Sequence, residues 1–314
     1  METSKLICAY MLGLSLTLSG CAAAKGQQAG SMGSEYKMLL EQQKLKAAAS
    51  AATEEESRKK LPDLNAEGYE RLGDDYVRQG NLLMALIKYG KSLQLDPGAS
   101  GVRYKMGRLM VQLGMGAEAM KQFDEILKLA PASALAHFGQ GLAFLADSQP
   151  ARAEEKFNRA AELDPALWQA YLCLGMIYDR QQRFSAAIGE YDKALAINPR
   201  SAYVLNNRGV SCWLNGEYEK SIESFIAALQ INPANTRIYN NLGLAYAGAG
   251  RFDEAFEAFK KGGNEAGARN NIGYIYMVEG KRQKAAEAFQ EAMEASPNFY
   301  VKAQENIDRL SGIR

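Results

Sequence analysis

Histidine and cysteine are both scarce in this sequence of 314 residues, which has one histidine and four cysteines. Cys8 falls inside the N-terminal leader described below and Cys21 stands at its end, so only Cys173 and Cys212 remain in the body of the chain. A zinc site takes three or four protein ligands. We therefore expect no metal centre.

Local motifs for catalysis are also lacking. His137 lies four residues before a repeating glycine, where three other repeats carry Tyr69, Tyr171 and Tyr239, so we assign it a packing role. Gly248-Ala249-Gly250 follows no predicted strand, which argues against a phosphate-binding loop. No serine or cysteine stands in a nucleophile motif. We predict a protein that is not an enzyme and needs no cofactor.

An excess of charge of one sign is missing as well. The chain has 37 basic and 36 acidic residues, and the two signs are interspersed. Proteins that bind nucleic acid present a basic stripe, so nucleic acid is not an expected partner. The uncharged run from Leu6 to Gly20 is shorter than the ~20 apolar residues of a spanning helix, and no second such run follows it.

A glycine returns every 34 residues through most of the chain. The repeating glycines are Gly73, Gly107, Gly141, Gly175, Gly209 and Gly243, followed after 30 residues by Gly273. A prolyl turn keeps the same period, at Pro97, Pro131, Pro165, Pro199, Pro233 and Pro297. Both series therefore record one deletion of four residues. A fixed period of this length predicts a solenoid of stacked repeats.

Other residue types keep fixed distances from these glycines. Twelve residues after the glycine stand small residues: Ala85, Ala119, Ala153, Ala187, Ser221, Ala255 and Ala285. Sixteen residues after it stand aromatic ones: Tyr89, Phe123, Phe157, Tyr191, Phe225, Phe259 and Phe289. Small residues let two helices approach, and the aromatic rings fill the space between pairs. A second glycine seven residues after the first, as at Gly80 and Gly216, suits the C-terminal end of a helix.

The pattern resembles the tetratricopeptide repeat, a helix-turn-helix unit of 34 residues. In the fourth repeat the resemblance is carried by Tyr171, Leu174, Gly175, Tyr178, Ala187, Tyr191, Ala194 and Pro199. It implies an all-α superhelical solenoid of seven units over residues 66–297. Residues 298–314 add a capping helix and tail, with Phe299, Ala303, Ile307 and Leu310 facing inward. Gly262-Gly263-Asn264 replaces the prolyl turn of the sixth repeat and predicts a tighter junction there, with a local change of superhelix pitch.

Residues 1–20 read as a signal peptide, with Lys5 before an apolar core. The core ends in Leu18-Ser19-Gly20-Cys21, which resembles the bacterial lipobox. The resemblance implies that Cys21 becomes the first mature residue and carries fatty acyl chains, palmitate among them. Because Ala22 and not aspartate follows, the expected location in a Gram-negative cell is the periplasmic face of the outer membrane. Residues 21–65 then comprise the lipidated cysteine, a flexible linker and, over 35–60, either a helical stalk or a disordered segment.

Three pairs of asparagines stand two and three residues before their glycines. They are Asn206-Asn207, Asn240-Asn241 and Asn270-Asn271. Asparagine is a poor helix former, and its amide both donates and accepts hydrogen bonds. In tetratricopeptide arrays this part of the first helix lines the concave wall, and a similar asparagine ladder lines the peptide groove of the O-linked N-acetylglucosamine transferase repeats. We predict a groove for extended peptides, with Tyr203, Trp213, Arg237 and Tyr274 beside the asparagines. The alternative is that these asparagines only bond locally.

The lipobox together with the repeats looks like the lipoproteins of the tight-adherence (Flp) pilus system and, more broadly, like pilotins. The segments that strengthen this impression are Gly262–Ala266, Asn270–Tyr274 and Tyr300–Ala303. The resemblance implies a membrane-anchored periplasmic scaffold or chaperone whose partner is a secretin or a pilus-assembly component. The alternative is an adaptor lipoprotein that regulates peptidoglycan hydrolases or envelope proteases.

Overall fold

The computed structural model describes residues 64–296 and 300–312. The signal peptide, Cys21, the segment up to residue 63 and Phe299 lie outside the described residues, so the expectations for them stay predictions. The chain divides into two compact units, one ending at Ala170 and one beginning at Tyr171.

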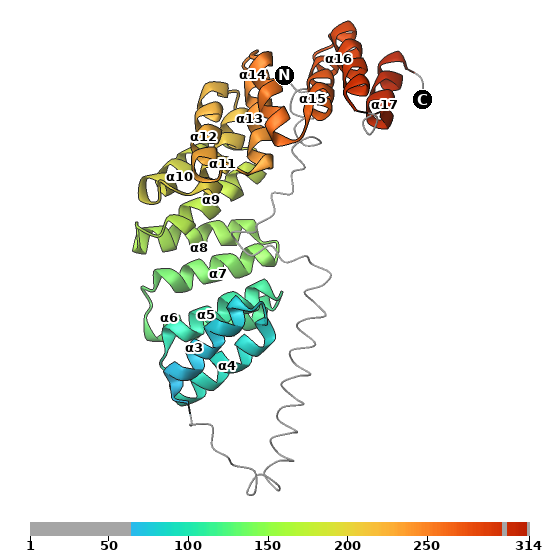
Figure 1. Cartoon of the computed structure of the whole chain (residues 1–314). Coiled ribbons are helices and arrows are strands. Elements are labelled where there is room, and N and C mark those ends of the chain that lie inside the picture. Colours follow the sequence, from blue (N-terminus) through green and yellow to red (C-terminus); the bar gives the residue numbers. More distant parts are fainter. Residues whose placement is uncertain (1–63, 297–299, 313–314) are drawn as a thin grey trace, which may run out of the picture. The chain divides into compact units, whose positions relative to one another are not determined.

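The described residues form helices joined by short turns (Figure 1). Those before the unit boundary are α3 (Ala66–Arg78), α4 (Leu82–Leu95), α5 (Ser100–Gln112), α6 (Gly116–Leu129), α7 (Ala134–Ala146) and α8 (Pro150–Leu163). α9 (Trp168–Arg180) crosses it. Those after it are α10 (Phe184–Ile197), α11 (Ala202–Leu214), α12 (Tyr218–Ile231), α13 (Thr236–Gly248), α14 (Phe252–Gly262), α15 (Glu265–Val278), α16 (Arg282–Ala295) and α17 (Tyr300–Ser311).

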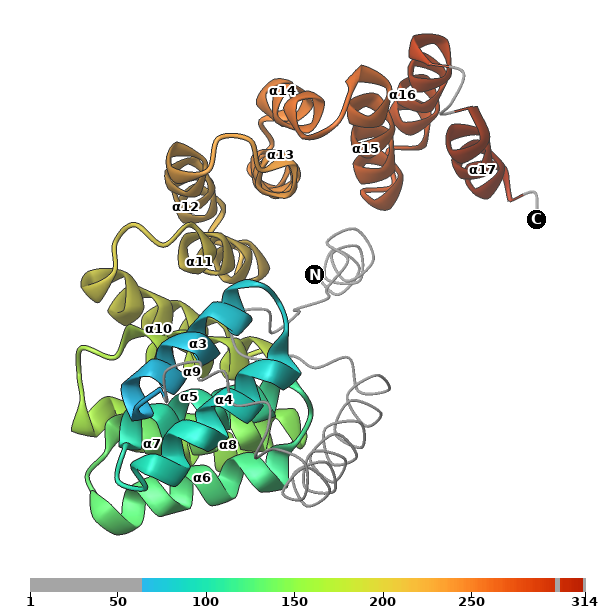
Figure 2. The same ribbon diagram turned by 60° about the horizontal axis from the view of Figure 1, so that its bottom comes forward.

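The helices pack as consecutive pairs, one pair to each sequence repeat. Within a unit each pair contacts the next through its second helix, as α4 contacts α5 and α12 contacts α13. Figure 2 shows the pairs α11–α12, α13–α14 and α15–α16 following one another. The prediction of an all-α repeat solenoid is confirmed. We refer to repeats 1 to 7 in the order of their glycines, and to the first and second helix of each. None of the described helices is long and apolar enough to cross a bilayer.

The repeating glycine holds the two helices of a repeat together. A Cβ atom placed on any of the seven would lie 2.5–2.7 Å from the ring of the aromatic residue sixteen positions later. Those rings are at most 2% exposed, and the small residues twelve positions after the glycine are fully buried. The spacing of small and aromatic residues in the sequence therefore reports direct contact between paired helices.

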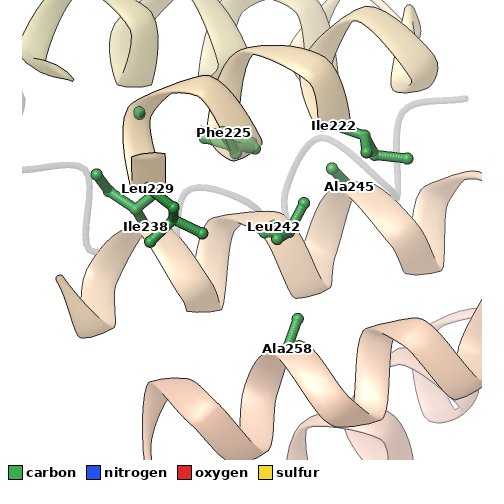
Figure 3. Packing of buried hydrophobic residues seen from close by; sticks show 8 residues of the cluster. Ile222, Phe225, Leu229, Ile238, Leu242, Ala245 and Ala258 are labelled. Carbon is green, nitrogen blue, oxygen red and sulfur yellow. The ribbon is translucent and has the colours of Figure 1, made fainter. Parts of the chain in front are cut away.

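Side chains from successive repeats make a continuous apolar core. Figure 3 shows Ile222, Phe225 and Leu229 of α12 against Ile238 and Leu242 of α13, with Ala258 of α14 on the far side. At the C-terminal end Ala303 is fully buried, and Ile307 and Leu310 pack beside it against α16, as expected for a capping helix. Lys302, Glu305 and Arg309 on the other side of α17 are exposed.

The junction between repeats 6 and 7 is shorter than the others. α14 has 11 residues where the other second helices have 14, and α15 begins at Glu265 with Asn264 as its N-cap. The Asn264 side chain accepts a hydrogen bond from the Gly267 backbone N–H at 2.8 Å. The expected tighter junction is therefore present, because the deleted residues come from the end of α14 and its turn. The change of pitch stays a prediction.

The turn between the two helices of a repeat requires a left-handed backbone. Gly80, Gly114, Gly216, Gly250 and Gly280 have φ between 73° and 81°, but Ser148 and Gln182 occupy the same place at φ 58°. A residue with a Cβ atom is sterically strained in this left-handed conformation, whereas glycine is not.

We expect Gln182→Gly to stabilise the protein by about 1 kcal/mol, because glycine relieves that cost. The reverse change, Gly216→Gln, should destabilise by a similar amount. Urea unfolding followed by helical circular dichroism measures both. Equal stabilities of wild type and Gln182→Gly would contradict the argument.

Candidate partner-binding surface

The six predicted asparagines lie on three successive first helices, α11, α13 and α15. Asn207 and Asn241 are buried, with 7% and 6% of their surface exposed, and the other four are half-buried. We call the faces of these helices that carry the asparagines the asparagine face. Its side chains are therefore largely covered in the free protein.

Hydrogen bonds bring three of the asparagines together. Asn241 Nδ2 donates to Asn206 Oδ1 at 3.0 Å, which joins α13 to α11. Asn206 Nδ2 in turn donates to Asn207 Oδ1 at 3.4 Å. The result is a row of amides that runs across two neighbouring helices.

The bond between α11 and α13 has counterparts elsewhere in the chain. Lys105, two residues before its glycine, donates to Glu70, three before the preceding glycine, at 2.8 Å. Asn306 of the capping helix donates to Asn270 at 3.2 Å. In each of these bonds the donor follows its acceptor by 35 or 36 residues. A search of the sequence for polar residues about one repeat apart would have found these pairs.

Asn207 breaks this rule because the acceptor position in the preceding repeat holds Leu172. A leucine side chain accepts no hydrogen bond, and Asn207 Nδ2 has no partner among the described residues. A buried donor left unpaired costs free energy. Asn207 is thus the one asparagine of the face that lacks a partner for a buried amide group.

The remaining asparagines are placed differently. Asn240 packs against Gly262 at the end of α14, where a Cβ atom would collide with its Oδ1. Asn270 is bonded to the capping helix, and Asn271 is half-buried. The structure therefore does not line up all six amides in one row.

The predicted aromatic and basic neighbours also differ in their surroundings. Trp213 donates its indole N–H to the Leu244 carbonyl at 3.0 Å and so ties α11 to α13. Tyr203 is 37% exposed, and its hydroxyl lies 3.9 Å from the Met176 sulfur. Arg237 is exposed, while Tyr274 is half-buried and packs near the capping helix. Of these four residues, Tyr203 and Arg237 are the most exposed to solvent.

A buried carboxyl group near Asn207 was not anticipated. Asp179, 7% exposed, accepts hydrogen bonds from the Tyr191 hydroxyl at 2.7 Å and the Ser211 hydroxyl at 2.6 Å. Ser211 also contacts the Asn207 carbonyl at 3.0 Å. Burial raises the pKa of Asp179 to about 6, although the two hydrogen bonds lower it. The signal in the sequence is Tyr191, because most residues in its position are phenylalanines and need no acceptor.

We expect Asn241→Ala to destabilise the protein by about 1 kcal/mol, since it leaves the side-chain oxygen Oδ1 of Asn206 without its donor. Asn207→Ala should cost less than Asn241→Ala, because the amide nitrogen that it removes has no partner and its Oδ1 accepts only the long 3.4 Å bond from Asn206. Urea unfolding of the two variants side by side checks the contrast. A larger loss for Asn207→Ala than for Asn241→Ala would show that the hydrogen-bond assignment is wrong.

Comparison with known proteins gives matches to repeat proteins. Models described as tetratricopeptide repeat or TPR repeat match residues 104–167, 168–201, 213–250 and 266–299. Among solved structures, the C-terminal part of a TPR repeat-containing protein from Cytophaga hutchinsonii is 18% identical with a TM-score of 0.55, over 72% of this chain and 95% of that one.

Two further solved structures are similar at lower scores. A tetratricopeptide repeat protein from Parabacteroides merdae is 18% identical, covers 78% of this chain and 98% of its own, and has a TM-score of 0.49. YrrB, described as a TPR protein with an unusual peptide-binding site, is 16% identical over 64% of this chain and 97% of its own, with a TM-score of 0.48. The comparison with curated proteins found no significant match.

Proposed function

Because the chain belongs to the tetratricopeptide-repeat family, we propose that it binds extended segments of partner proteins along the asparagine face. The fold is a scaffold suited to protein–protein interaction. Within that general role, α11 and α13 supply amides that can meet a peptide backbone whatever its side chains. Tyr203 and Arg237 supply exposed contacts beside them.

The observation that carries this proposal is the unpaired Asn207 amide. Its nitrogen is covered and has no acceptor among the described residues, and a carbonyl group of a bound segment would give it one. Since neighbouring side chains cover the nitrogen, we expect binding to be accompanied by a side-chain rearrangement in α11. The hydrogen bond between Asn206 and Asn241 would fix the position of α11 relative to α13 while a segment binds.

For the cellular role, we propose a lipoprotein held by acyl chains on Cys21 at the periplasmic face of an outer membrane. The support is the sequence Leu18-Ser19-Gly20-Cys21 after an apolar core. Two acyl chains anchor a protein stably where one does not. The resemblance to tight-adherence pilus lipoproteins and pilotins favours a secretin or pilus component as the partner.

Cross-linking in intact cells tests this role, followed by purification of the full-length protein from membranes and identification of the attached chain. Recovery of a secretin or pilus component is the expected result. Recovery of peptidoglycan hydrolases or proteases alone would support the adaptor alternative instead. Cys21→Ser should release the protein from the membrane fraction, and a protein that stays there would contradict the anchor.

The binding face is tested with the recovered partner. Replacing Asn207, Asn241 and Asn271 together by alanine should weaken binding by more than about 1 kcal/mol, roughly one hydrogen bond. Asn215→Ala, in the exposed turn after α11, is the control and should leave affinity unchanged. A smaller loss in a folded triple variant would place the partner elsewhere.

A further inference from the structure

Repeat 6 has an open groove of about 320 Å³ between its two helices. It is lined by Tyr239, Leu242 and Tyr246 of α13 and by Asp253, Glu254, Glu257, Ala258 and Lys261 of α14. Tyr239, Leu242 and Tyr246 are three and four residues apart, so they share one face of α13. At 3.6 residues per turn, that face lies roughly opposite Asn240 and Asn241. The groove is therefore turned away from Asn241, although Asn240 lies near its Lys261 end, against Gly262 of α14.

In other repeats an arginine of the chain itself lies at the matching positions. Arg208 of repeat 5 stands one residue before its glycine, as Leu242 does in repeat 6. Its Nη1 donates to the Ser224 hydroxyl at 2.6 Å and its Nε to Asp192 at 2.5 Å. Ser224 occupies the position of Ala258. The Arg208 guanidinium group thus joins both helices of repeat 5 and also α10 of repeat 4, whereas the two matching positions of repeat 6, Leu242 and Ala258, are apolar.

Repeats 2 and 7 provide the same group from another position. Arg103 and Arg269 stand four residues before their glycines, where repeat 6 has Tyr239. Arg103 Nη1 donates to Gln122, which holds the position of Ala258, at 3.3 Å. Arg269 forms an ion pair with Glu291, which holds the position of Lys261. Three repeats therefore accommodate an arginine between their helices. In repeat 5 it stands one residue before the glycine, and in repeats 2 and 7 four residues before it.

Repeat 6 has neither of these arginines but keeps groups that suit one. Asp253 and Glu257 are exposed, stand four residues apart on α14, and form no ion pair with the described residues. Glu254 is paired with Arg251 at 2.7 Å, and Arg251 also lies 4.7 Å from the Tyr246 ring centre. Lys261 lies 6.0 Å from the Tyr239 ring centre. Like charges four residues apart on a helix repel each other, so a cation between Asp253 and Glu257 would be favourable.

We propose that this groove receives an arginine side chain from a partner protein. The methylene stem would lie on Leu242 and Ala258, which both line the groove and belong to one buried cluster. The planar guanidinium group would lie against a tyrosine ring and donate to Asp253 and Glu257, an arrangement that suits arginine better than lysine. This site lies on a different face from the proposed peptide surface and does not depend on it.

The test uses N-acetyl-arginine amide as the probe and N-acetyl-citrulline amide, its uncharged analogue, as the comparison. Full-length protein with ¹³C-labelled tyrosine rings is titrated with each compound, and Tyr239→Phe and Tyr246→Phe identify the two signals by NMR. Both signals should shift with the arginine compound and not with the citrulline compound. Equal shifts with both compounds, or no shift with either, would overturn the proposal.

Matched variants locate the charge that matters. Asp253→Asn with Glu257→Gln should weaken arginine binding about tenfold, the effect of losing two exposed ion pairs. Glu219→Gln with Glu223→Gln makes the same charge change at the same positions of repeat 5, where Arg208 already lies, and should leave binding unchanged. If both pairs weaken binding equally, or the first changes it less than twofold, the groove is not the site. The triple asparagine variant should bind the probe like wild type.

Discussion

Gly139→Ala should destabilise the protein by about 2 kcal/mol, even though alanine is the better helix former by about 1 kcal/mol. Gly139 of α7 lies against the ring of Phe123, and an added Cβ atom would overlap that ring. The ring is fully buried, and a Cβ on Gly107 would also meet it, at 2.7 Å from Cε1. A fully buried ring in close contact with two glycines has little room to move, so we expect the added Cβ atom to strain the packing.

Gly90→Ala is the matched control for this result. Gly90 lies inside α4 of the same unit, and a Cβ atom there would meet nothing within 4 Å. It should stabilise by about 0.5–1 kcal/mol through helix propensity alone. Urea unfolding followed by circular dichroism measures both variants. If Gly139→Ala proves as stable as Gly90→Ala, the close contact with Phe123 is not a constraint on the fold.

Asp179→Asn should stabilise the protein by as much as about 3 kcal/mol at pH 8 and by almost nothing below pH 4. Burial raises the pKa of Asp179 from 3.8 to about 6, so the folded state binds this proton more tightly than the unfolded state. The contribution of Asp179 to stability is therefore present below about pH 4. It is lost as the pH rises through about 6, where the buried group must ionise.

Asparagine suits the same hydrogen bonds without the charge. Its Oδ1 can accept from the Tyr191 hydroxyl, and its Nδ2 can donate to Ser211 Oγ, whose proton is then directed to the Asn207 carbonyl. Asp179→Ala should be less stable than Asp179→Asn at every pH, because the buried Tyr191 hydroxyl loses its acceptor. Asp253→Asn, on an exposed residue, is the control for a lost charge. A wild-type stability that is flat between pH 4 and 8 would contradict the argument.

The sequence predicted the fold well because its repeat makes the same contact seven times. A glycine and an aromatic residue sixteen positions apart are visible without coordinates, and each pair proves to be a contact. Even the departures from the pattern have compensating bonds. Ser221 donates to the Gly209 carbonyl at 2.7 Å, and Gln140 donates to Asp124 at 2.8 Å. Each of these bonds joins residues at two different positions of the repeat, so the residue types found at one position do not predict it.

The candidate site could be predicted only in part. The positions of the asparagines on α11, α13 and α15 follow from the repeat, but the partners of their amides do not. Asn241 bonds to Asn206 because the preceding helix offers an acceptor, whereas Asn207 meets Leu172. The groove of repeat 6 was missed for a similar reason, since it is defined by an arginine that neighbouring repeats have and this one lacks.

The capping helix bears on how such an array can have grown during evolution. Lys302, Glu305 and Arg309 point away from α16, and another repeat added after α17 would have to bury these charges without partners, at a high cost. Duplication of a repeat in the interior meets no such obstacle, because each interior pair already matches a neighbour on both sides. Lengthening of this lineage is therefore expected to occur by internal duplication, with the terminal helix inherited unchanged.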